Sequence, residues 1–171
     1  LIDLNRSSRE GMRPLQLSEL LDSMLDSNSE WLAQHKIKLV RDWHSPQSRV
    51  LAIHSHIKQV CQNLISNAVD AMPRGGTLTV RMYQERPSEH NGLPGSSEDL
   101  GSQVVEFQDT GDGIPPEDLH KIFEPFYTTK SSGGLSLSTS YHIVQQHGGE
   151  LSASSTPGVG TLLRLRLPAI E

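Results

Sequence analysis

Cysteine and long apolar runs are both scarce in this sequence. Cys61 is the only cysteine among 171 residues, so no disulfide can form within the chain, and a reducing compartment is the simplest interpretation. No apolar stretch is long enough to cross a lipid bilayer, and no signal-peptide pattern is visible. These absences argue against a disulfide-stabilised scaffold and against a membrane-spanning segment within the 171 residues.

The chain also lacks a run of basic residues. Its formal net charge is −5, which argues against a nucleic acid as the main partner. Charged residues make up 20% and hydrophobic residues 35%, which is typical of a globular domain and not of a disordered chain. The length fits one domain with its own core. Because the sequence begins at Leu1 without a methionine, we expect it to be a fragment of a longer protein.

Hydrophobic periodicity predicts helices and strands in mixed order. The predicted helices cover 17–32 (with Ser18 as N-cap), 55–72, 115–123 and 138–147. The predicted strands cover 37–43, 49–53, 77–83, 102–110, 149–156 and 160–168. The last two strands form a hairpin around the turn TPGVG. This order favours an α/β sandwich with a mixed or largely antiparallel sheet over a doubly wound parallel sheet.

The helix predicted over 55–72 carries a stripe of carboxamides. Gln59, Asn63 and Asn67 are spaced at i, i+4 and i+8, which places them along one helix face. Asparagine is unfavourable inside helices, so two of them on one stripe require an explanation. One explanation is a Mg²⁺ site, because carboxamide oxygens are neutral ligands for a hard cation that also binds phosphate oxygens and water. The other is a solvated polar face, and the spacing alone does not choose between them.

The segment DTGDGIP, residues 109–115, directly follows a predicted strand. Asp109 could accept a hydrogen bond from an exocyclic amine such as that of adenine. Gly111 and Gly113 would let the backbone approach a flat ligand closely. An ordinary Asp-Gly turn is the alternative, and for this segment alone it is the stronger interpretation.

Residues 122–130, IFEPFYTTK, gather aromatic side chains in a chain that has few. Phe123, Phe126 and Tyr127 would anchor a loop or form a small satellite core, and Lys130 could reach a phosphate.

A glycine-rich segment follows and leads into the helix predicted at 138–147. Gly133 and Gly134 would present backbone N–H groups and the positive end of the helix dipole to an anion. A single glycine loop is weak evidence on its own.

Together, and in this order, the segments resemble the ATP-binding catalytic domain of sensor histidine kinases, in the GHKL superfamily. Residues 59–72 resemble its asparagine box, 109–115 its first glycine box, 122–130 its phenylalanine box, and 133–138 an altered second glycine box. The resemblance covers nearly the whole chain from about Leu15. It implies the Bergerat fold, a two-layer α/β sandwich of a mixed sheet on helices, with ATP and Mg²⁺ as cofactors.

The resemblance also implies roles for individual residues. Asn67 would be the Mg²⁺ ligand, and Asn63 would contact Mg²⁺ or phosphate. Asp109 would bind the adenine amino group, and Gln59 stands where related ATPases keep a glutamate that activates water. The implied catalytic residues are Asn63, Gln59 and Lys130. The implied nucleotide-binding residues are Asn63, Asn67, Asp109, Gly111, Gly113, Ile114, Lys130, Gly133, Gly134, Leu135 and Thr161.

The resemblance further implies a protein-histidine kinase in cytoplasmic two-component signalling. Residues 1–14 would be the end of an upstream dimerisation helix and a linker, and residues 15–171 the catalytic domain, with a lid at about 128–138. The expected partners are ATP, the upstream phosphoacceptor domain of the same protein and a downstream response regulator, with no nucleic acid. The fragment is expected to be monomeric and its parent a homodimer.

The second glycine box departs from the family pattern. Ser136 stands where the third glycine is expected, and the residue that should separate Gly133 from Gly134 is missing. The Cβ of Ser136 could block close approach of a phosphate or forbid a positive φ at this position. Three explanations stay open: weaker ATP binding, a degenerate module that uses the fold for protein contacts, or lid residues that differ in the parent protein.

Overall fold

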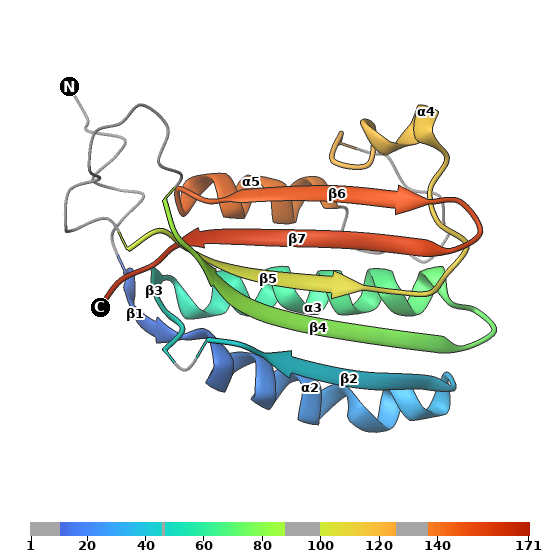
Figure 1. The fold of residues 1–171 in the computed structure, drawn as a ribbon, viewed down its shortest axis with the longest axis horizontal. Helices are drawn as coiled ribbons and strands as arrows, with labels where there is room; N and C mark the ends of the chain where they lie inside the picture. The colour runs from blue at the N-terminus through green and yellow to red at the C-terminus, as the bar shows by residue number, and fades with distance from the viewer. Residues whose placement is uncertain (1–10, 46, 88–99, 126–136) are drawn as a thin grey trace.

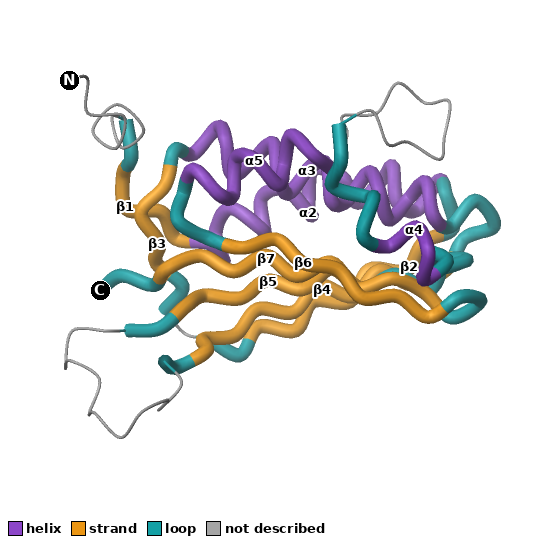
Figure 2. Tube along the Cα trace, turned by 90° about the horizontal axis from the view of Figure 1, so that it is seen from above, coloured by secondary structure: helices purple, strands orange, loops and turns teal. Residues whose placement is uncertain are grey.

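The helices α2, α3 and α5 lie together on one face of a five-stranded β-sheet (Figures 1 and 2). The computed structural model describes residues 11–45, 47–87, 100–125 and 137–171. The elements in chain order are β1 (Arg13–Gln16), α2 (Leu17–Gln34), β2 (Ile37–Trp43), β3 (Arg49–Ala52), α3 (His54–Ala71), β4 (Gly76–Glu85), β5 (Ser102–Gln108), α4 (Pro116–Leu119), α5 (Leu137–Gln146), β6 (Glu150–Thr156) and β7 (Gly160–Pro168).

The sheet is mixed, as the element order predicted. Its strand order is β2-β4-β5-β7-β6, with β2 parallel to β4 and every other neighbouring pair antiparallel. The strands β6 and β7 form the predicted hairpin. Strands β1 and β3 pair separately in a two-stranded antiparallel sheet. The prediction of a two-layer α/β sandwich is therefore confirmed.

Alternate residues of the central strands supply the sheet side of the core. Leu78, Val80 and Met82 of β4 are fully buried, and their helix-side counterparts include Leu21, Leu25, Ile57, Leu64, Ile65 and Val144. Burying one such side chain stabilises the folded chain by roughly 1.5–3 kcal/mol. Among the described helices, none has the length and apolarity needed to span a membrane.

The start of α2 corrects one sequence expectation. Ser18 was expected as the N-cap, but the helix begins at Leu17 and its N-cap position is Gln16. Ser48, which precedes β3, accepts the first helical N–H groups instead: its carbonyl oxygen accepts from Leu17 N at 2.9 Å and its Oγ from Ser18 N at 2.9 Å. A cap from a residue 30 positions away leaves no local signal.

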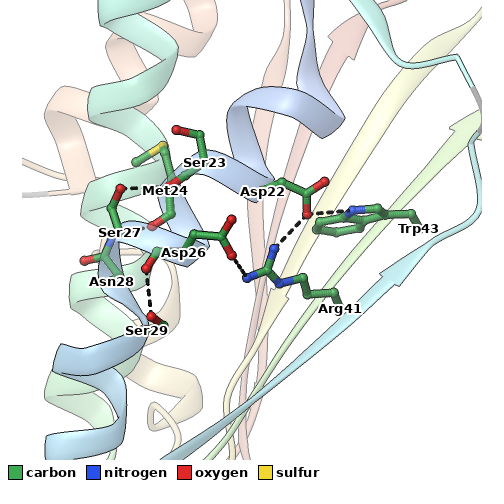
Figure 3. Close-up of polar contacts among 9 residues, drawn as sticks. All are labelled: Asp22, Ser23, Met24, Asp26, Ser27, Asn28, Ser29, Arg41 and Trp43. Atoms are coloured by element: carbon green, nitrogen blue, oxygen red, sulfur yellow. Dashed lines mark hydrogen bonds and ion pairs between the residues drawn. The ribbon is translucent and has the colours of Figure 1, made fainter.

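Helix α2 is attached to the edge strand β2 through Arg41 (Figure 3). The Arg41 guanidinium donates to Asp22 Oδ1 at 2.8 Å and also to Asp26, on two turns of the helix. Trp43 Nε1 donates to the same Asp22 oxygen at 3.2 Å. These contacts fix the helix on the strand at the edge of the sheet.

Candidate nucleotide-binding site

Asp109 directly follows β5 and is held by backbone amides. Its side chain is only 4% exposed. Oδ1 accepts hydrogen bonds from Gly111 N at 2.9 Å and from Thr161 N at 3.1 Å, and Asp109 N donates to Thr161 O at 2.9 Å. The carboxylate is therefore fixed by its own turn and by the start of β7.

The glycines of this turn are required by the protein backbone itself. A Cβ on Gly111 would lie 2.2 Å from the carbonyl oxygen of Ala71, at the end of α3. Gly113 has φ +77°, and a Cβ there would lie 2.6 Å from the carbonyl oxygen of Thr156, at the end of β6. Real Cβ atoms do not make such contacts, so both positions demand glycine for packing, whatever the ligand.

Thr161 and Ile114 meet at Ser155, a residue that the sequence analysis did not single out. Ser155 Oγ accepts from Ile114 N at 2.7 Å and donates to Gly160 O at 3.0 Å. Thr161 Oγ1 lies 3.1 Å from Ser155 Oγ, and Thr161 is 3% exposed. Because the Ser155 proton is used on Gly160, Thr161 is the donor in this pair. The alternation along β6 could have identified Ser155 from the sequence. Ser155 follows Leu151 and Ala153 at a spacing of two residues, so it lies on the same inward-facing side of the strand.

The carboxamide stripe on α3 is not a solvated face throughout. Asn63 is 5% exposed, and its Nδ2 donates to Ser140 Oγ of α5 at 3.0 Å. Asn67, one helical turn further on, is partly exposed, and its side chain makes no hydrogen bond to another described residue. Gln59, at the other end of the stripe, is also partly exposed. The solvated-face interpretation is therefore wrong at Asn63.

This stripe fits a Mg²⁺ ion in its donor chemistry. The Asn67 carboxamide makes no hydrogen bond to another described residue. Among the described residues, Asn63 is hydrogen bonded through its side-chain nitrogen alone, to Ser140. Two neutral oxygens on one helix face suit a cation that keeps water and phosphate oxygens as its remaining ligands.

Four predicted phosphate-side residues lie outside the described residues, together with most of the predicted lid. They are Lys130, Gly133, Gly134 and Leu135. Phe126 and Tyr127 lie outside as well, whereas Phe123 is described and packs against the main core. Phe123 also stacks on Tyr141 of α5, with ring centroids 5.3 Å apart and planes at 28°. Phe123 is thus packed against α5, the helix that follows the predicted lid.

Comparisons with known proteins show which family the chain resembles. Residues 52–171 match the family described as histidine kinase-, DNA gyrase B- and HSP90-like ATPases. The chain is 37% identical to the sensor kinase CckA of Brucella abortus over 96% of its own length and 18% of that protein. It is 32% identical to the sensor histidine kinase ZraS of Klebsiella oxytoca over 98% of its length and 34% of that protein.

Two solved structures of histidine kinases are similar to this chain in fold. The catalytic domain of histidine kinase ThkA, in a nucleotide-free form, superposes with a TM-score of 0.74 at 26% identity, covering 92% of this chain and 97% of that one. The mycobacterial sensor histidine kinase MprB superposes with a TM-score of 0.75 at 25% identity, again over 92% and 97%. The chain spans about a third or less of the length of the curated relatives named above. It belongs to the family of histidine kinase-, DNA gyrase B- and HSP90-like ATPases, and its fold is that of a histidine kinase catalytic domain.

Proposed function

We propose that this chain is the ATP-binding catalytic domain of a sensor histidine kinase, which transfers the γ-phosphate of Mg·ATP to a histidine on an upstream domain of the same protein. The observation that carries the proposal is the Asp109 carboxylate. It is buried to 4% exposure and oriented by two backbone amides, at the start of a turn packed against the helix that bears the asparagines. A buried and oriented carboxylate is an acceptor that suits an amine of a ligand.

Each described residue has a distinct task in this proposal. Asp109 accepts a hydrogen bond from the exocyclic amino group of adenine, and this selects adenine over a base with a carbonyl there. Thr161 and Ile114 line the same end of the site through their contacts with Ser155. Asn67 and Asn63 would hold Mg²⁺, and the ion would supply positive charge that screens the phosphates.

The transfer itself forms a bond between a histidine nitrogen and the γ-phosphorus and breaks the bond to the bridging oxygen, so ADP leaves. Gln59 favours this route over hydrolysis, because a neutral amide cannot take a proton from water as a glutamate would. Lys130 and the lid backbone at Gly133, Gly134 and Leu135 are proposed as the remaining phosphate contacts.

The surroundings of the domain belong to the same proposal. Residues 1–14 connect it to an upstream dimerisation and phosphoacceptor domain, residues 15–171 form the catalytic domain, and a response regulator receives the phosphoryl group. The fragment is proposed to be a cytoplasmic monomer and the parent protein a homodimer.

A second candidate, a degenerate module that serves protein contacts, is favoured by one observation: Ser136 in place of a glycine within a shortened lid box.

Titration calorimetry with a non-hydrolysable ATP analogue and Mg²⁺ tests the proposal. Wild-type protein should bind, and Asp109→Asn should weaken binding at least tenfold, because it loses a charged acceptor. Asp112→Asn is the matched control: Asp112 lies three residues away in the same turn, and its described partner is the exposed Arg74. Absence of binding at millimolar nucleotide would reject ATP binding, and equal affinities for wild type and Asp109→Asn would reject the adenine assignment.

The parent protein separates the two candidates. With labelled ATP, the full-length protein should phosphorylate its own histidine if the domain is a kinase. Binding without any phosphorylation would favour the degenerate module.

A further inference from the structure

Helix α5 has one polar residue on its buried stripe. The stripe is Leu137, Ser140 and Val144, with exposures of 8%, 0% and 0%. Spacing of three and four residues marks the core-facing side of a helix, where an aliphatic residue is the usual choice. A hydroxyl buried there is unfavourable unless it is hydrogen bonded. The hydrogen-bond partner of Ser140 therefore explains how a serine is tolerated at this position.

That partner is the candidate metal-site residue Asn63. Its Nδ2 donates to Ser140 Oγ at 3.0 Å, and the two residues are 77 positions apart in the sequence. Both side chains are buried, at 5% and 0% exposure, so water does not compete for the bond. A hydrogen bond in such surroundings is stronger than one at the surface and holds its partners in a defined orientation.

The orientation matters because a carboxamide has two unlike ends. When the nitrogen of Asn63 is held by Ser140, its oxygen points to the other side of the planar group. Only the oxygen can bind a cation, because the NH₂ group is a hydrogen-bond donor and offers no lone pair. Without the hydroxyl, rotation of the amide by half a turn would present the NH₂ group to the cation.

We propose that Ser140 is a positioning residue that orients Asn63 for Mg²⁺ and so links α5 to the metal end of the site. The inference rests on the proposed Mg·ATP binding. It is analogous to the outer-shell partners that orient first-shell metal ligands elsewhere. Because Ser140 lies on α5 and Asn63 on α3, the metal end then depends on how these two helices pack.

The test compares Ser140→Ala with Thr139→Ala in the whole chain. Thr139 is the matched control, because it also carries a hydroxyl on the first turns of α5 but is exposed. Affinity for the ATP analogue is measured over a series of Mg²⁺ concentrations and again in chelator without metal. Ser140→Ala should raise the half-saturating Mg²⁺ concentration about tenfold, the lower end of what removing an outer-shell partner does. Affinity without metal should stay within about twofold, since the adenine end is unchanged.

The Mg²⁺ dependence of binding, and not the melting temperature, separates this role from a merely structural one. The melting temperature should fall in either case, because Ser140→Ala leaves the buried Asn63 donor without its partner. A merely structural role would weaken nucleotide binding equally with and without Mg²⁺, and that result would overturn the proposal. A double-mutant cycle gives the second criterion: in an Asn63→Ala background, Ser140→Ala should leave the Mg²⁺ dependence unchanged. A further loss there would show that Ser140 acts without Asn63 and would also overturn the proposal.

Failure of the inference is distinct from failure of the proposed function. If wild type binds the analogue in a Mg²⁺-dependent way and Ser140→Ala does the same, only the positioning role is wrong. If wild type binds no nucleotide, both the proposed function and the positioning role are wrong.

Discussion

The two ends of the candidate site hold their polar side chains by different means. At the sheet end, Asp109 is fixed by backbone N–H groups of its own turn and of β7. At the helix end, Asn63 is fixed by one side-chain bond to Ser140, between two helices that are separate in sequence. Backbone donors persist through most substitutions, whereas a side-chain partner such as the Ser140 hydroxyl can be lost by a single substitution. The proposed adenine end is therefore built into the sheet, and the proposed metal end depends on the packing of α3 against α5.

The largest expected effect tests the sheet end. Gly111→Ala should destabilise the chain by about 3 kcal/mol or more, because its Cβ would clash with the Ala71 carbonyl oxygen. Urea unfolding measures this difference. The control is Gly158→Ala, where φ is +78° but the space is open, so only the backbone strain of about 1–2 kcal/mol is expected. Equal losses at both positions would mean that Gly111 is not required by packing on α3.

At the helix end we expect smaller effects, on the stability of the fold for one asparagine and on nucleotide affinity for both. Asn63→Ala should lower both stability, by about 1–3 kcal/mol from the orphaned Ser140 hydroxyl, and Mg²⁺-dependent nucleotide affinity. Asn67→Ala should lower only the nucleotide affinity, because Asn67 is partly exposed and its side chain makes no hydrogen bond to another described residue. Urea unfolding and calorimetry on the same variants separate the two losses. If Asn67→Ala unfolds as easily as Asn63→Ala, the distinction between them is wrong.

The smallest expected effect concerns the far end of α5. His147 is buried there, with Nδ1 donating to Ile143 O at 2.8 Å and Nε2 accepting from Ile53 N at 3.1 Å. Burial lowers the pKa of His147, and the nearby His56 lowers it further, against the opposing hydrogen bond to Ile143. The folded state thus disfavours the proton, so this contribution to stability is complete above the unfolded pKa of about 6.5 and is lost as pH falls through the folded pKa.

Unfolding at pH 8 and at pH 5.5 measures this contribution. His147→Gln should reduce the loss of stability on acidification, whereas His142→Gln, on the exposed face of the same helix, should leave it unchanged. An identical pH dependence in wild type and His147→Gln would show that the α5–α3 contact is insensitive to protonation.

Much of the local structure was predictable because it depends on neighbouring residues. The helix of residues 54–71 and the hairpin of β6 and β7 agree with their predicted ranges to within a residue or two, since periodicity and turn residues are local signals. The order of helices and strands also pointed to the mixed sheet. The site candidates Asp109, Asn63 and Asn67 came from short motifs whose order along the chain carried the interpretation.

The sequence by itself therefore determined most of the secondary structure, the mixed sandwich and the short motifs of the site. It did not predict β1, which lies next to a predicted linker, and the helix predicted over 115–123 is only the four-residue α4, Pro116–Leu119. Only the tertiary structure decided that Ser48 caps α2, that Ser155 connects Ile114 with Thr161, and that Ser140 holds Asn63. Each of these serines uses its hydroxyl to contact a residue between 6 and 77 positions away, and Ser48 also uses its carbonyl oxygen. A hydroxyl leaves no periodic signal in a sequence, because its partner is chosen by the packing of strands and helices and not by neighbouring residues.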